Sequence, residues 1–201
     1  MKSRWLVVLF CLGIGVSCQK NSTAPRSGEM IRAGTYADAV QALAHHHNAN
    51  AVLVQIRSAG VCPEGDAARW EHWYTDFQTG QMLYLHTTTA GAQFDSSAAR
   101  RLYGTARLSK GWMDSDQALH IVETQGGTSF RTAHPECQIT AQLGQPVRPD
   151  SRPHWTVTYQ DTAGTTGELR VRIDALTGTV VSNSIPEGGA AWIPRQSTPA
   201  W

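Results

Sequence analysis

The chain has 201 residues, of which 41% are hydrophobic and 16% are charged, and its formal net charge is +1. That length and composition are sufficient for one medium or two small globular domains with an apolar core. The near-neutral charge argues against nucleic acid as a partner, since such proteins need a basic face. No apolar run reaches the roughly 20 residues of a membrane-spanning helix.

The N-terminal residues have the order of regions found in a secretory signal. Two basic side chains precede an apolar stretch at 5–16, which is too short to span a bilayer. Residues 15–18, Gly-Val-Ser-Cys, resemble the bacterial lipoprotein box, although Gly stands where Leu is usual. The resemblance implies a signal peptide at 1–17 and lipidation of Cys18; an ordinary signal peptide cleaved nearby is the alternative. The polar sequence of 18–33 predicts a flexible tether.

The cysteines suit a protein of the cell envelope. Cys11 would leave with the signal peptide and Cys18 would carry the lipid, so Cys62 and Cys137 remain in an oxidising compartment. We therefore predict a disulfide between these two, with two thiols as the alternative. Gln19, rather than Asp, follows Cys18. This resembles the pattern by which enteric bacteria sort lipoproteins to the outer membrane. The resemblance implies a lipid anchor on the periplasmic side of that membrane.

The sequence contains an internal repeat, because residues 34–91 can be laid over residues 112–180. The matches are Gln41-Ala42-Leu43 with Gln117-Ala118-Leu119, Cys62 with Cys137, Trp70, Tyr74 and Asp76 with Trp155, Tyr159 and Asp161, and Gly80 and Gly91 with Gly167 and Gly178. The predicted organisation is module 1 at 34–91, a helical inter-module segment at 92–111, module 2 at 112–183 and an irregular tail at 184–201. The cysteine bridge would join the two modules.

Each module is predicted to open with a helix and to continue into antiparallel strands. The first helix reaches His47; the second is capped by Asp114 and ends at Gly126-Gly127. Alternating apolar residues predict a sheet with one buried face, which in module 2 is formed by Trp155, Val157, Tyr159, Leu169, Val171 and Ile173. The expected fold class is α+β: two tandem modules, each a helix packed on an antiparallel β-sheet.

The end of module 2 resembles the PepSY family. Residues 155–159, Trp-Thr-Val-Thr-Tyr, and then 168–181 follow its strand, turn and strand with an Ile-Asp-x-x-Thr-Gly bend. Module 1 departs from this pattern at 86–91. The resemblance implies a helix on an antiparallel sheet outside the cytoplasm, without catalysis, and often a role in inhibiting or chaperoning another enzyme. The tandem layout is also similar to the β-lactamase inhibitory protein, whose two repeats form a concave binding sheet.

The sequence lacks the common catalytic motifs. It contains no Gly-x-Ser-x-Gly elbow, His-Glu-x-x-His, phosphate-binding Gly-Lys-Ser or Cys-x-x-Cys. We therefore expect a protein that is not an enzyme and needs no cofactor.

Three histidines give a metal site as an alternative. The repeat places His46, His72 and His86 at inward positions of module 1, where converging imidazoles would suit zinc or copper. The competing interpretation is that these are ordinary core or edge histidines with hydrogen-bond partners.

The second face of the module 1 sheet is the candidate binding surface. It would carry Trp73, Leu83 and Leu85, where module 2 has Thr and Arg. Either the chain covers this apolar face itself, or a protein partner does. Trp192 and Trp201 in the tail are further possible anchors.

The expected function is that of a lipid-anchored periplasmic protein that binds and inhibits another protein. The target would be an envelope hydrolase toxin, with this chain as its immunity protein, or a peptidase. Two alternatives remain: a lipoprotein that binds metal or a small ligand through the histidines of module 1, and a structural lipoprotein of envelope assembly. The membrane would be reached through the lipid alone, and nucleic acid is not an expected partner.

Overall fold

The computed structural model describes residues 30–99, 105–148, 151–162 and 167–184. The predicted signal peptide, Cys18, and the tail residues Trp192 and Trp201 lie outside these ranges. In chain order the elements are α1 (Ala37–His47), β1 (Val52–Ala59), β2 (Trp70–Thr75), β3 (Gln81–Thr88), β4 (Gly91–Ala99), α2 (Ser115–Val122), η1 (Glu123–Gly127), α3 (Thr128–Ala133), β5 (Cys137–Gly144), β6 (His154–Asp161), β7 (Glu168–Asp174) and β8 (Val180–Ser184). The η1 element is the connection between α2 and α3, where the chain kinks at Gln125 and Gly126.

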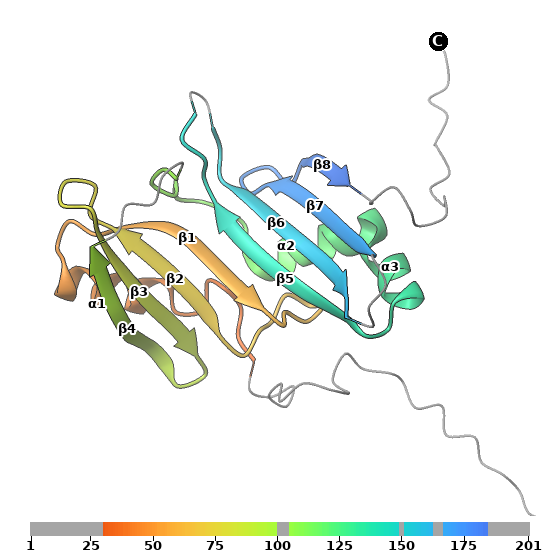
Figure 1. Cartoon of the computed structure of the whole chain (residues 1–201), viewed down its shortest axis with the longest axis horizontal. Coiled ribbons are helices and arrows are strands. Elements are labelled where there is room, and N and C mark those ends of the chain that lie inside the picture. Colours follow the sequence, from red (N-terminus) through yellow and green to blue (C-terminus); the bar gives the residue numbers. More distant parts are fainter. Residues whose placement is uncertain (1–29, 100–104, 149–150, 163–166, 185–201) are drawn as a thin grey trace, which may run out of the picture.

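The eight strands form one antiparallel sheet in the order β4-β3-β2-β1-β5-β6-β7-β8. Strands β1 and β5 pair at its centre, so β1 to β4 run outward on one side and β5 to β8 on the other (Figure 1). Helix α1 precedes β1 in the chain, and the helical segment α2-η1-α3 precedes β5. The protein is therefore a mixed α/β chain whose helices accompany one large sheet.

The alternation of strand residues gives the sheet one apolar and one polar face. A row of directly paired residues crosses all the strands: Phe94, Leu85, His72, Ile56, Leu143, Trp155, Ile173 and Val180. The adjacent row is Gln93, His86, Glu71, Arg57, Gln142, Thr156, Arg172 and Ser182. Neighbouring residues of a strand point to opposite faces. The apolar row packs with α1 through Leu85 and with α2 through Ile173, so both helices lie on the same face.

Two tryptophans meet in the main core. The rings of Trp70 and Trp155 lie edge to face with centroids 6.0 Å apart, and both side chains are fully buried. A buried indole N–H needs a hydrogen-bond acceptor. Trp70 Nε1 donates to Ile31 O at 2.8 Å and Trp155 Nε1 donates to Met113 O at 2.9 Å. The predicted burial of the module 2 strand residues is confirmed, since Trp155 and its alternating neighbours are all in this core.

Two hairpins are closed by the same Asp-x-x-Thr-Gly turn. Asp76 Oδ1 accepts hydrogen bonds from the backbone N–H groups two and three residues later, and Asp174 Oδ1 does the same. Gly80 and Gly178 have φ of 74° and 77°, a left-handed conformation that favours glycine. The turns join β2 to β3 and β7 to β8. The sequence alignment paired Gly80 with Gly167 instead; turn geometry pairs it with Gly178.

The predicted inter-module helix is wrong, whereas the predicted end of the second helix is confirmed. The segment 92–111 was expected to be helical, but the strand β4 covers most of its first half and pairs with β3 along its length. Asp95 lies within this strand. The second helix does end at Gly126-Gly127: Gln125 and Gly126 have non-helical backbone angles, with a φ of 119° at Gly126, and the separate short helix α3 follows this break. A Cβ on Gly127 would lie 2.8 Å from Tyr159 Oη, so close packing explains the second glycine.

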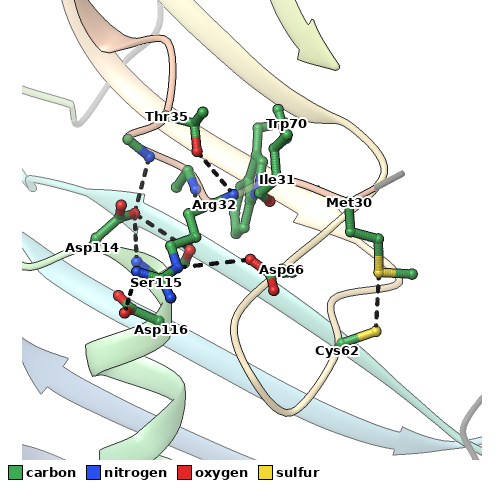
Figure 2. A network of polar contacts seen from close by, with 12 residues as sticks. Met30, Ile31, Arg32, Thr35, Cys62, Asp66, Trp70, Asp114, Ser115 and Asp116 are labelled. Carbon is green, nitrogen blue, oxygen red and sulfur yellow. Dashed lines mark hydrogen bonds and ion pairs between the residues drawn. The ribbon is translucent and has the colours of Figure 1, made fainter. Parts of the chain in front are cut away.

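The predicted cap of α2 is confirmed, and it also holds the N-terminal end of the described chain. Asp114 and Gln117 form a capping box with the backbone of the first turn. Asp114 Oδ1 also accepts from Gly34 N at 2.9 Å, and Ser115 Oγ accepts from Ala33 N at 3.1 Å (Figure 2). Two residues that are about 80 positions away in sequence are thus fixed to the start of α2.

The predicted disulfide is not formed in the structure. Cys62 Sγ lies 3.3 Å from Met30 Sδ (Figure 2), and neither Cys62 nor Cys137 is disulfide-bonded. Val61 N donates to Ile139 O at 3.0 Å, so the chain brings the neighbourhoods of the two cysteines together. The cysteines are not equivalent positions of a repeat, however, since Cys137 opens β5 whereas Cys62 follows the end of β1. The bridge stays a prediction from the sequence.

Candidate functional site

The polar face of β1 to β4 carries a compact group of aromatic and charged side chains. We name it the open-face cluster; it comprises Arg57, Arg69, Glu71, Trp73, Tyr84, His86 and Asp95. A hollow of about 500 Å³ lies among most of these residues. Since α1 packs on the opposite face, no described helix covers this hollow.

Two aromatic rings form the centre of the cluster. Trp73 and Tyr84 are directly paired across β2 and β3, with ring centroids 5.5 Å apart at an interplanar angle of 81°. The guanidinium carbon of Arg57 lies 4.3 Å from the centroid of the Trp73 ring, in cation–π distance. Both aromatic side chains are half-buried. The rings are therefore held at fixed angles while part of each remains accessible.

Three short polar contacts orient the charged side chains. Arg57 Nε donates to Glu71 Oε2 at 2.7 Å, and Arg69 Nη2 donates to Asp95 Oδ2 at 2.7 Å. The other oxygen of Asp95 lies 2.7 Å from His86 Nδ1. The arginines are about half exposed, so these pairs add little to folding stability. Their consequence is geometric: both guanidinium groups are pre-oriented beside the rings.

The predicted docking patch is partly wrong. Trp73 does lie on the face opposite α1, but Leu83 and Leu85 are each only 1% exposed and pack under α1 with Val40 and Ala44. The cause is the period of a strand: Leu83 pairs with Tyr74, one residue out of phase with the Trp73–Tyr84 pair. The chain thus covers the two leucines itself. Tyr84 takes the place that the leucines were expected to have.

The three candidate metal-binding histidines do not converge. His72 pairs with Leu85 on the helix side, whereas His86 pairs with Glu71 on the polar face, so the sheet separates their imidazoles. His46 is exposed on α1. No cluster of histidine, cysteine and carboxylate side chains within the described ranges has the arrangement of a metal site. The three-histidine site is therefore a wrong prediction.

His72 is instead a buried core residue. It is 1% exposed, its Nε2 lies 3.1 Å from Thr87 Oγ1, and its Nδ1 has no hydrogen-bond partner among the described residues. Burial, and secondarily the neighbouring His86, lowers the pKa of His72 to about 4. The imidazole is therefore neutral at pH 7.

Most residues of the open-face cluster were not predicted from the sequence. Trp73 was singled out as a binding residue, but Arg69 and Asp95 lie outside any repeated pattern. Arg69 precedes β2 and Asp95 sits at the bulge of β4 opposite Tyr84 and Leu85. Only the pairing of β2, β3 and β4 brings them together, so no local signal marks them.

The comparisons with known proteins leave the family open. No family model matches the chain, and no curated protein matches it. Among solved structures the chain is similar to a predicted lipoprotein of Clostridium difficile 630, at 10% sequence identity and a TM-score of 0.49. That similarity covers 84% of this chain and 97% of the other. None of the helices in the described ranges has the length and apolar character needed to cross a membrane.

Proposed function

We propose that this chain is a lipid-anchored protein of the cell envelope that binds and restrains another protein through the open-face cluster. One observation carries the proposal: Trp73, Tyr84, Arg57 and Arg69 stand together on a sheet face that none of the described helices covers. Trp, Tyr and Arg are the residue types that dominate binding hot spots in protein interfaces. Their mutual contacts reduce the side-chain entropy that binding would otherwise cost.

The occupant of this face is a folded protein partner. The hollow of about 500 Å³ has room for side chains of a partner, and its flanks are polar and charged like the rim of an interface. We infer that the partner is an envelope hydrolase toxin, with this chain as its immunity protein, or a peptidase. The lipoprotein-like residues 15–18 and the lack of a catalytic motif support this inference.

We also infer that the two halves are tandem modules, each a helix packed on its own strands. The strand order is symmetric about the β1–β5 pair, and the Asp-x-x-Thr-Gly turn occurs once on each side. The turn closes the β2–β3 hairpin in the first half and the β7–β8 hairpin in the second half. The strands of the two modules therefore correspond only after a shift of one strand. A binding surface on the first module alone would then be a specialisation of one copy.

The test uses the soluble Cys18→Ser chain without its signal peptide. It is titrated into the hydrolases or peptidases encoded beside it, and their activities are measured. We expect one of these enzymes to be inhibited, and Trp73→Ala to weaken the inhibition by at least about tenfold. Gln142→Ala, on the same face but outside the cluster, is the matched control.

Equal inhibition by the Trp73→Ala and Gln142→Ala proteins would remove the open-face cluster as the binding surface. A photo-crosslinking amino acid at position 73, compared with one at the exposed Val147, adds an in-cell measurement. Crosslinks from position 73 to envelope scaffold proteins, with no enzyme inhibited, would point to the structural role in envelope assembly instead.

A further inference from the structure

A second hollow lies on the helix-covered side of the sheet, away from the open-face cluster. It has a volume of about 930 Å³ and runs between α2, the loop at 63–64 and the β7–β8 turn. We name it the α2 groove; the residues that matter for the argument are Glu64, Trp112, Met113, Asp116, Ile121 and Leu176. It belongs to the second half of the sheet and shares no residue with the open-face cluster.

Part of the lining of the α2 groove is apolar. Trp112, Met113 and Ile121 pack against the main core but stay partly exposed, and Leu176 is 41% exposed. The position of Leu176 is fixed, since its backbone N–H donates to Asp174 Oδ1 at 2.9 Å within the turn. An apolar surface on rigid elements, open to solvent, gains free energy when a partner covers it.

The lining also includes Glu64 and Asp116, which have Asp66 and Asp114 as neighbouring carboxylates outside the lining. The carboxyl groups of Glu64, Asp66, Asp114 and Asp116 interact electrostatically, and the cation among them is Arg32. Arg32 is 2.8 Å from Asp116 and 3.8 Å from Asp66 (Figure 2). Burial has the largest effect on Asp66 and raises its pKa. Arg32 acts in the opposite direction, and the neighbouring carboxylates add to the increase. Glu64 is exposed, and no described residue pairs with its side chain. This end of the groove therefore has an excess of negative charge.

We propose that the α2 groove binds a cationic segment of a protein partner that also carries apolar side chains. Leucine-like side chains of the segment would cover Trp112 and Leu176, and a lysine or arginine would pair with Glu64 and Asp116. Opposite charge steers such a segment to the groove, and apolar contact holds it there. The apolar side chains of Trp112 and Leu176 line the same hollow as the carboxylates of Glu64 and Asp116, so a segment with both kinds of side chain satisfies them together.

The experiment measures fluorescence anisotropy of a labelled amphipathic peptide built of Leu and Lys. A second peptide, with Glu in place of Lys, is the charge control. The protein is the soluble Cys18→Ser chain. We expect the Lys peptide to bind, the Glu peptide not to bind, and added salt to weaken binding. Glu64→Lys and Leu176→Ser should each raise the Kd about tenfold.

Two matched variants test whether this binding is specific to the groove. Val147→Ser removes another exposed apolar side chain, and Glu136→Lys reverses an exposed carboxylate; neither residue lines the groove. Both should leave the Kd unchanged, as should Trp73→Ala in the open-face cluster. Circular dichroism spectra confirm that each variant is folded. The proposal is overturned by no binding, by equal binding of both peptides, or by equal losses in groove and control variants.

Discussion

Arg57 covers Trp73, with the guanidinium carbon 4.3 Å from the ring centroid, while the Nε of the same arginine donates to Glu71 at 2.7 Å. Arg57 is on β1 and the other two residues are on β2, two positions apart and on the same face. The sheet thus supplies the spacing, and the glutamate fixes the arginine over the ring. A partner would meet a surface whose side chains are already ordered, which lowers the entropic cost of binding.

The different environments of Leu83 and Trp73 should appear directly in unfolding experiments. Leu83→Ala opens a cavity under α1 and should reduce the free energy of unfolding by about 2–5 kcal/mol. Trp73→Ala removes a half-buried side chain from the polar face and should cost less than Leu83→Ala. Urea unfolding followed by circular dichroism measures both values. A larger loss for Trp73→Ala would contradict the assignment of the faces.

His72 should make the protein sensitive to mild acid. Its pKa is lowered from the ordinary 6.5 to about 4 in the folded state, so below pH 6.5 the unfolded chain binds the proton and the folded chain does not. Stability should therefore fall as the pH decreases from about 6.5 towards 4, by about 3 kcal/mol in total from this group.

The control for this pH dependence is a pair of histidine substitutions. His72→Leu should flatten the dependence of unfolding free energy on pH between about 6.5 and 4, and the exposed His46→Leu should not. The slope is the measured quantity, since His72→Leu also leaves Thr87 Oγ1 without its partner. Identical slopes for wild type and His72→Leu would show that another group titrates.

Gly65 is required by a close approach of two segments. A Cβ at this position would lie 2.4 Å from the backbone of Asp116, and the glycine φ is 88°. Gly111 has a similar φ of 83° but open space around its Cα. Gly111→Ala should therefore cost only the conformational penalty of about 1–2 kcal/mol, and Gly65→Ala clearly more. Thermal unfolding of the two variants gives the comparison; equal losses would contradict the predicted clash.

Glu123 should be a stabilising residue of the kinked helical segment. Its carboxylate accepts hydrogen bonds from Arg131 Nη2, Tyr159 Oη and Thr128 Oγ1, each 2.7 Å long. Burial raises the pKa of Glu123, but these hydrogen bonds and the charge of Arg131 outweigh it and lower the pKa below 4.5. The stabilisation is present above the ordinary pKa and is lost as the pH falls through the lowered one.

Two substitutions separate the parts of this network. Tyr159→Phe removes one hydrogen bond and should cost about 1 kcal/mol, while Glu123→Gln weakens all of them and should cost more. Glu123→Gln should also remove this group's contribution to acid sensitivity. Chemical unfolding at several pH values measures both effects. A Glu123→Gln protein as stable as wild type would show that the carboxylate charge is not needed.

Local features of the sequence predicted several elements correctly. Asp114 and Gln117 are three residues apart before an apolar run, which is sufficient for a capping box because only one helical turn takes part. The alternation Trp155, Val157, Tyr159 sets one buried face, since side chains of a strand alternate regardless of its partners. Likewise the Asp-x-x-Thr-Gly turn at 174–178 closes on itself, through bonds within five residues.

The side of the sheet that the helices cover was decided by the tertiary structure. In β3 both sets of alternate residues contain apolar side chains, so the period cannot tell whether Leu83 or Tyr84 faces α1. Helix α1 packs on the face that carries Tyr74 and Leu83, so Trp73 and Tyr84 lie on the open face. The strand β4 likewise exists through its ladder with β3, a long-range pairing, and without it Asp95 would not reach Arg69 and His86. The open-face cluster follows from packing between strands, and the residues of one strand alone do not contain that information.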